Sequence, residues 1–276
     1  HLRKSNYNID PHGSITVDDC INGHSKLGIN YGVAPPRQKP PGMFPGKCKP
    51  LGVHIRDRIK FGPPPWIAER KVNHPPPKMW ILLDIIHAIE YLKTFVFFHK
   101  IPASDKIALA KNVTLMTAYI TNSFKAFQSK SDVTVHADGC IPGGGQMLEW
   151  VHLPEAREEV ELHYETVQRV KQLNLDKREY VLIKALIACN PAIEDLSSRS
   201  RSIMQEQRDR YAKSLMSYVM ARRGMIEGPH IYSEIMSHVE WLTRLAKKQK
   251  DMYVLICALG LRNDKMAPLM DEILGS

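Results

Sequence analysis

The residues that could carry out acid–base or metal chemistry in this chain do not form a pattern that supports catalysis. Twelve histidines are present, but the sequence has no His-Glu-x-x-His pair, no Gly-x-Ser-x-Gly turn and no glycine fingerprint after a strand. The five cysteines form no Cys-x-x-Cys pair, which argues against a zinc module and favours reduced intracellular thiols. The glycine run 143–145 lacks the Gly-Lys-Ser/Thr ending of a phosphate-binding loop. We therefore predict that the chain is not an enzyme and holds no metal.

Charged residues do interrupt one strongly apolar segment. Residues 79–98 are apolar on nearly every side of a helix, and Asp84, Glu90 and Lys93 lie among them. Twenty such residues could span a bilayer. Each charge would cost roughly 2.5–3.5 kcal/mol there, so we predict a core helix. At about 100° per residue, Asp84 and Lys93 point to opposite sides, and Asp84 points inward if Lys93 faces solvent.

Helical patterns continue along the chain. We expect a joint at 99–105 and a second apolar helix that ends at Phe127. Amphipathic spacing predicts helices over 154–173, 198–223 and 232–261, and Gly224 ends the second of these. Asp176 and Glu179 form a capping box that begins another helix, which stops at Asn190-Pro191. Residues 132–139 alternate in polarity and end in Asp-Gly, which suits a short strand or hairpin.

The last apolar segment, 267–274, is too short to fold alone. Pro268 suits the first position of a helix. One face of this helix would be apolar, through Leu269, Met270, Ile273 and Leu274. Isolated helices below about 12–15 residues are marginal in water. We therefore expect this segment to be ordered only when it is docked.

Three stretches resemble the ligand-binding domains of nuclear hormone receptors. The first resembles the family signature through Tyr91-Leu92-Lys93, Phe98, Ile101-Pro102, Asp105 and Leu109 with Lys111, and departs from it at Val96-Phe97, Lys106 and Ala110. Residues 179–191 resemble the eighth helix of these domains, and residues 269–274 resemble their activation helix. The resemblance implies an all-α, three-layer antiparallel helical sandwich with one small β-hairpin, covering 78–276. It points to divergent orphan receptors related to the hepatocyte nuclear factor type.

The resemblance also implies a groove for a Leu-x-x-Leu-Leu helix of a coactivator. Lys93 and Glu272 match the lysine and glutamate that hold the two ends of that helix, in keeping with its dipole. Lys111 matches a second basic position at the rim. The implied apolar lining is Ile89, Phe98, Ile107, Leu269, Met270 and Ile273. Docking of the last helix, biased by ligand or packing, would complete the groove and act as the activation switch.

The ligand pocket is implied in the same way. Asp84 and Lys125 fall where many steroid and retinoid receptors carry polar residues that bind one end of a ligand. Ile81 and Asn122 are expected to line the same space. Lys125 would meet either Asp84 or the acidic head of a fatty-acid-like or other lipophilic ligand. An Asp84–Lys125 ion pair without a ligand is the alternative.

Residues 1–77 differ from the rest in composition. Up to Lys78 the chain carries a net charge of +8, out of +9 for the whole chain, and 13 of its 19 prolines. Such a composition opposes a packed core, so we expect a basic, proline-rich linker or hinge that is largely disordered. Contact with nucleic-acid phosphates and a solvated spacer are the two interpretations of its charge.

Membership of this family would imply a ligand-regulated transcription factor that works in the nucleus. The helix 232–261 would form a homo- or heterodimer, and DNA would be bound only through a zinc-finger module that has no counterpart here. Because the sequence begins with His1, we expect it to be a piece of a longer protein. A helical scaffold that binds neither ligand nor coactivator is the alternative, and no contact with a membrane is expected.

Overall fold

A computed structural model describes residues 16–22, 80–132, 134, 154–259 and 268–275. These residues form helices joined by connections and include no strand, which confirms the predicted all-α fold for the part described. The hairpin predicted at 132–139 and most of the linker predicted at 1–77 lie outside the described residues. The helices are α1 (Val17–Asn22), α4 (Trp80–Lys93), the 3-10 helix η2 (Val96–Lys100), α5 (Ala103–Gln128), α7 (Pro154–Leu173), α8 (Lys177–Ala188), α9 (Ser198–Ala258) and α10 (Pro268–Leu274).

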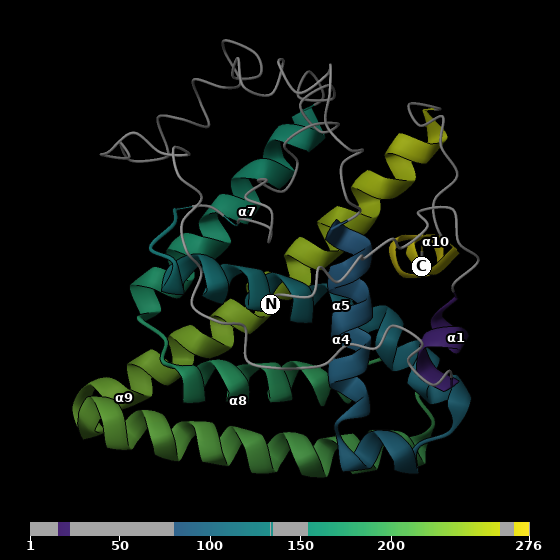
Figure 1. The fold of residues 1–276 in the computed structure, drawn as a ribbon. Helices are drawn as coiled ribbons and strands as arrows, with labels where there is room; N and C mark the ends of the chain where they lie inside the picture. Colours follow the sequence, from purple (N-terminus) through teal and green to yellow (C-terminus); the bar gives the residue numbers. More distant parts are fainter. Residues whose placement is uncertain (1–15, 23–79, 133, 135–153, 260–267, 276) are drawn as a thin grey trace, which may run out of the picture.

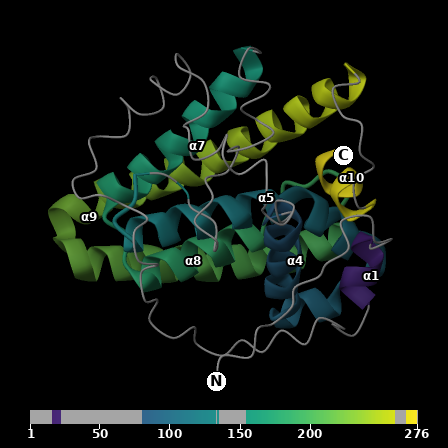
Figure 2. The ribbon, with the colours of Figure 1, turned by 45° about the horizontal axis from the view of Figure 1, so that its top comes forward.

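The helix α5 runs through the middle of the molecule, and the other helices pack around it. Its residues from Val113 to Ile120 are all buried, and it contacts α4, α7, α8, α9 and α10. Figures 1 and 2 show α8 beside the first part of α9 on one side of α5, and α7 beside the second part of α9 on the other. The core is therefore a stack of helical layers with α5 at its centre.

The helix α4 ends at Lys93, earlier than the predicted end at Phe98. The backbone of Phe95 is extended, with φ −84° and ψ 132°, and the chain continues as η2. The ring of His99 lies 2.9 Å from the carbonyl oxygen of Lys93, which a longer helix would have bonded to a backbone amide. The interruption lets both Phe97 and Phe98 enter the core. No described helix is both long and apolar enough to cross a membrane.

The start of α8 is stabilised by the predicted capping box. The Asp176 carboxylate accepts hydrogen bonds from the backbone amides of Arg178 and Glu179, both at 2.8 Å. In return, the Glu179 carboxylate accepts one from the Asp176 amide at 2.9 Å. These contacts satisfy amide groups that have no partner within the helix, and they confirm the prediction.

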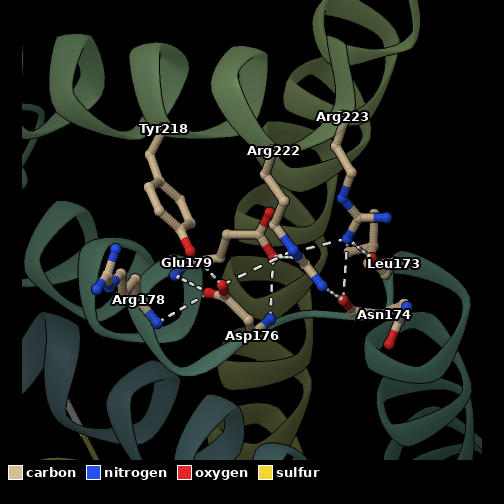
Figure 3. Close-up of polar contacts among 8 residues, drawn as sticks. All are labelled: Leu173, Asn174, Asp176, Arg178, Glu179, Tyr218, Arg222 and Arg223. Carbon is tan, nitrogen blue, oxygen red and sulfur yellow. Dashed lines mark hydrogen bonds and ion pairs between the residues drawn. The ribbon is translucent and has the colours of Figure 1, made fainter.

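The same glutamate joins α8 to α9. Figure 3 shows Arg222 and Arg223 of α9 reaching the connection between α7 and α8. The fully buried Glu179 carboxylate pairs with Arg222 and lies 3.7 Å from the guanidinium of Arg223. Arg223 also donates to the carbonyl oxygens of Leu173 and Asn174, at 2.8 and 2.9 Å. Three helices therefore meet at one buried charge cluster.

The helix α9 bends at Gly224, where φ is +84°, a conformation that glycine adopts readily. The sequence predicts that a new helix begins at Tyr232. The structure instead continues the helix directly from the bend and through Pro229. A Cβ atom on Gly228 would lie 2.7 Å from the sulfur of Met220, so a larger residue would push the two parts of α9 apart. The two glycines thus allow the sharp return visible in Figure 1.

Candidate functional site

The helix α10 lies against α4, α5 and α9. Its apolar face is buried as predicted, through Leu269, Met270, Ile273 and Leu274. The hydroxyl of Tyr253 on α9 donates a hydrogen bond to the Asp271 carboxylate and fastens the outer side of α10. Because seven residues are too few for a stable isolated helix, these tertiary contacts keep α10 helical.

Lys93, in the last turn of α4, directs its ammonium group toward α1. It donates to the carboxylate of Glu90 at 2.8 Å and to the carbonyl oxygen of Cys20 at 3.0 Å. Its side chain is 20% exposed. Cys20 lies near the C-terminal end of α1, where the helix dipole is negative. The ammonium group therefore meets the end of α1 that favours a positive charge.

Glu272 contacts the opposite end of α1. Its carboxylate accepts a hydrogen bond from the amide of Val17, the first residue of that helix, at 3.3 Å. Amides of the first turn have no partner within a helix, and that end of the dipole is positive. Lys93 and Glu272 therefore hold the two ends of the same short helix. At a rise of about 1.5 Å per residue, the six residues of α1 span about 9 Å. Figures 1 and 2 both show α1 next to α10.

The predicted groove residues of α4, η2 and α5 pack in the same apolar core as α1. Ile89 and Phe98 are buried, and Ile107 is half-buried. They belong to the apolar cluster that also contains Val17 and Ile21 of α1. The helix α1 contacts α4, α5 and α10. These predicted groove residues therefore share the core with α1, and their role in binding a coactivator stays a prediction.

Lys111, the third predicted clamp residue, is half-buried on α5. Its backbone carbonyl accepts a hydrogen bond from the ammonium group of Lys250 at 3.1 Å. Burial and the nearby charge of Lys111 lower the pKa of Lys250. These contacts place Lys111 beside the end of α9, and its role at the groove rim stays a prediction.

The predicted pocket residues lie where α4 crosses α5. The amide of Asn122 donates to the Asp84 carboxylate at 2.7 Å, Ile81 is half-buried, and Lys125 is exposed. Burial raises the pKa of Asp84, while the Asn122 hydrogen bond and the charge of Lys125 oppose this. Asp84 is therefore held by an amide, and Lys125 acts on it through its charge.

A buried histidine lies on the second part of α9. His238 is 1% exposed, and neither of its ring nitrogens has a hydrogen-bond partner among the described residues. Burial, together with the charge of Arg169, lowers the pKa of His238 to about 4. Within the described part of the chain, no group of acidic, histidine and cysteine side chains could hold a metal ion.

The sequence interpretation missed α1, because it falls inside the segment predicted to be a linker. Residues 17–22 are helical and docked on the domain. A local signal does exist: Val17, Cys20 and Ile21 have the apolar spacing i, i+3, i+4 that one helical face requires. Thr16 and Asp19 also have the spacing of a capping box at a helix start. Six residues do not predict a helix unless a docking surface is known.

Comparisons with known proteins point to one family, and the matches cover most of the helical part of the chain. The family model for the ligand-binding domain of nuclear hormone receptors matches residues 69–257. The nuclear hormone receptor family member nhr-153 of Caenorhabditis elegans is 36% identical over 170 residues, which cover 61% of this chain and 40% of the relative. Member nhr-136 of the same organism is 30% identical over 203 residues, with 71% and 46% covered. This chain spans less than half the length of these relatives.

Proposed function

This chain belongs to the nuclear hormone receptor family as one of its ligand-binding domains, and we propose that it binds a coactivator helix between α4 and α10. The parent protein would be a ligand-regulated transcription factor in the nucleus that contacts DNA through a zinc-finger module. The family consists generally of transcription regulators rather than enzymes. The hepatocyte nuclear factor-like branch stays a prediction, because the matching relatives are described only as members of the receptor family.

The placement of Lys93 and Glu272 carries this proposal. The two side chains meet the two ends of one helix, at 3.0 and 3.3 Å, across an apolar surface. A Leu-x-x-Leu-Leu helix needs the same three features: a cation at its carbonyl end, an anion at its amide end and an apolar floor. The docked α10 supplies the anion, so displacement of α10 would switch the site off.

A peptide titration tests the clamp. We expect the K93A and E272A variants to bind a labelled Leu-x-x-Leu-Leu peptide about tenfold or more weakly, because hydrogen bonds to charged groups are worth roughly 1.5–3 kcal/mol. Fluorescence polarisation measures the affinity, and circular dichroism confirms the helical fold. The controls K100A and E227A remove exposed charges outside the clamp. Because Lys93 and Glu272 also contact α1, the variants are compared in a chain that carries I21D, which removes α1 from the site. Unaltered affinity in both clamp variants of that chain rejects the proposal and favours a helical scaffold.

We also propose a lipophilic ligand with a polar head near Asp84, Asn122 and Lys125. The hydrogen-bonded carboxylate of Asp84 lies half-buried between α4 and α5 and supports a polar anchor at one end of an apolar space. Mass spectrometry of small molecules carried by the purified domain identifies the ligand class. A fatty-acid-like ligand should be retained less by K125A than by K130A, a change at another exposed lysine. Equal retention argues against contact with Lys125.

The end of α9 is the proposed dimer surface. Val254 and Leu259 are 53% and 52% exposed, although both are apolar. Two exposed apolar side chains near the end of a long helix are the observation that supports contact with a second ligand-binding domain there. We infer a homo- or heterodimer through the helix predicted at 232–261, of which the structure describes residues up to 259.

A further inference from the structure

The helix α1 occupies the surface assigned above to a coactivator helix, although it belongs to the same chain. Val17 is 0% exposed and Ile21 is 7% exposed, and α1 contacts α4, α5 and α10. Six residues are too few to stay helical in water. The contacts with these three helices therefore keep α1 ordered.

The pattern of α1 matches the motif that such a groove binds. Val17, Cys20 and Ile21 stand at positions i, i+3 and i+4, which is the spacing of the three leucines in Leu-x-x-Leu-Leu. Cys20 is partly buried against the same apolar cluster. Lys93 binds the carbonyl of Cys20, and Glu272 binds the amide of Val17. The helix α1 thus makes the contacts with Lys93 and Glu272 that are expected of a coactivator helix.

We propose that α1 is an intramolecular occupant of the coactivator groove, which an incoming coactivator must displace. The inference rests on the proposed function of that groove. Because α1 is covalently part of the chain, its docking does not depend on protein concentration. A coactivator can bind only the fraction of molecules whose groove is free. Its apparent dissociation constant is therefore the intrinsic constant divided by that fraction.

The sizes of the side chains make this occupation reversible. Valine and cysteine bury less apolar area than the leucines of a coactivator helix. A Leu-x-x-Leu-Leu helix therefore gains more from the groove than α1 does, and it displaces α1 above a threshold concentration. The helix α1 would set that threshold for the domain.

Hydrogen exchange of the whole chain 1–276, measured without peptide, tests the docking of α1. We expect its amides to be protected in the unmodified chain and in I21L, which keeps an apolar side chain, and to lose protection in I21D. Amides of α1 that exchange as fast as an unstructured peptide in the unmodified chain overturn the proposal. Protection that falls on dilution shows docking on a second copy, and it overturns the intramolecular assignment.

Peptide binding then tests the competition. With a labelled Leu-x-x-Leu-Leu peptide, I21D should bind about tenfold or more tightly than the unmodified chain if less than about a tenth of the molecules have a free groove. The I21L control should bind no more tightly than the unmodified chain. Equal affinity for the unmodified chain and I21D, with K93A still weakening binding when it is added to I21D, overturns the competition and leaves the proposed function intact. No binding by any variant, with α1 protected, rejects the proposed function and the competition while the docking of α1 stands.

Discussion

His238 is a histidine whose environment works against its charged form. Its ring is buried without a hydrogen-bond partner among the described residues, and its pKa is lowered to about 4. The ordinary pKa of histidine, close to 6.5, applies to the unfolded chain. Between pH 6.5 and 4 the unfolded state therefore binds a proton that the folded state does not. The free energy of unfolding must fall as the pH drops through that window.

We expect this residue to account for about 3 kcal/mol of acid destabilisation, since each pKa unit is worth about 1.4 kcal/mol. Urea unfolding at pH 7, 5.5 and 4.5 should show a smaller loss in H238L than in the unmodified chain. The control is H230L, which replaces an exposed histidine of the same helix. Identical pH profiles for H238L and the unmodified chain would contradict the assignment.

For Asp84, the sequence predicted the orientation of the side chain but not its hydrogen-bond partner. Its position in an apolar helix predicts an inward carboxylate, and the structure places it half-buried against Asn122. The partner was not predictable in the same way, because Asn122 and Lys125 lie on the same helix α5, one turn apart. Only the crossing of α4 and α5 decides which of the two contacts Asp84.

A small charge cluster joins α8 and α9 to the end of α7. Glu179 is fully buried, whereas the side chains of its partners Arg222 and Arg223 are 28% and 18% exposed. Removing one member of a buried pair leaves an uncompensated charge, which is far more costly than losing a pair on the surface. The cluster therefore couples the start of α8 to the bend of α9.

The E179Q variant should lower the free energy of unfolding by about 3 kcal/mol. Glutamine keeps the size of the side chain but removes the buried charge that Arg222 and Arg223 share, and only Arg222 keeps a second carboxylate, that of Asp176 at 3.7 Å. The matched control is E206Q, since Glu206 pairs with Arg210 on the surface with side chains 60% and 67% exposed. Such pairs contribute about 0–1 kcal/mol. Thermal or urea unfolding that shows equal losses in the two variants would contradict the role given to Glu179.

Helices with strong local patterns were predicted more accurately than the bends between them. The helix predicted over 154–173 coincides with α7, and Asp176 and Glu179 form the predicted capping box. The start of α9 at Ser198 and its break at Gly224 were predicted. The end of α4 and the restart expected at Tyr232 were wrong, because Phe97 and Phe98 turn into the core and the helix after Gly224 packs back on Met220. Periodicity reports the buried face of a helix, but it does not report where packing interrupts that helix.

The two described ends of the chain meet in the folded molecule. Val17 and Glu272 are 255 positions apart in sequence, yet their amide and carboxylate form a hydrogen bond. The helices α1 and α10 are each too short to be stable alone, so each contributes to the surface that orders the other. Any change that loosens one helix must loosen the other by the same coupling free energy.

The E272Q variant should therefore raise hydrogen exchange in residues 16–22 without exposing α5. Glutamine keeps the shape of the side chain but loses the charge that matches the amide end of α1. Exchange measured by mass spectrometry reports each segment separately. The D195N variant removes an exposed charge outside α1 and α10 and serves as the control. Unaltered exchange in residues 16–22 of E272Q would show that α1 docks without this contact.

The sequence alone determined those features that depend on neighbours along the chain. The pair of charges at Lys93 and Glu272 was implied by the family resemblance, whereas the helical class, the apolar face of α10 and the capping box are features of this kind. Their signals lie in side-chain spacing and in contacts across a few residues. The tertiary structure alone decided which helix those charges hold. That helix is α1, whose short apolar pattern acquires a fixed conformation only where α4, α5 and α10 meet.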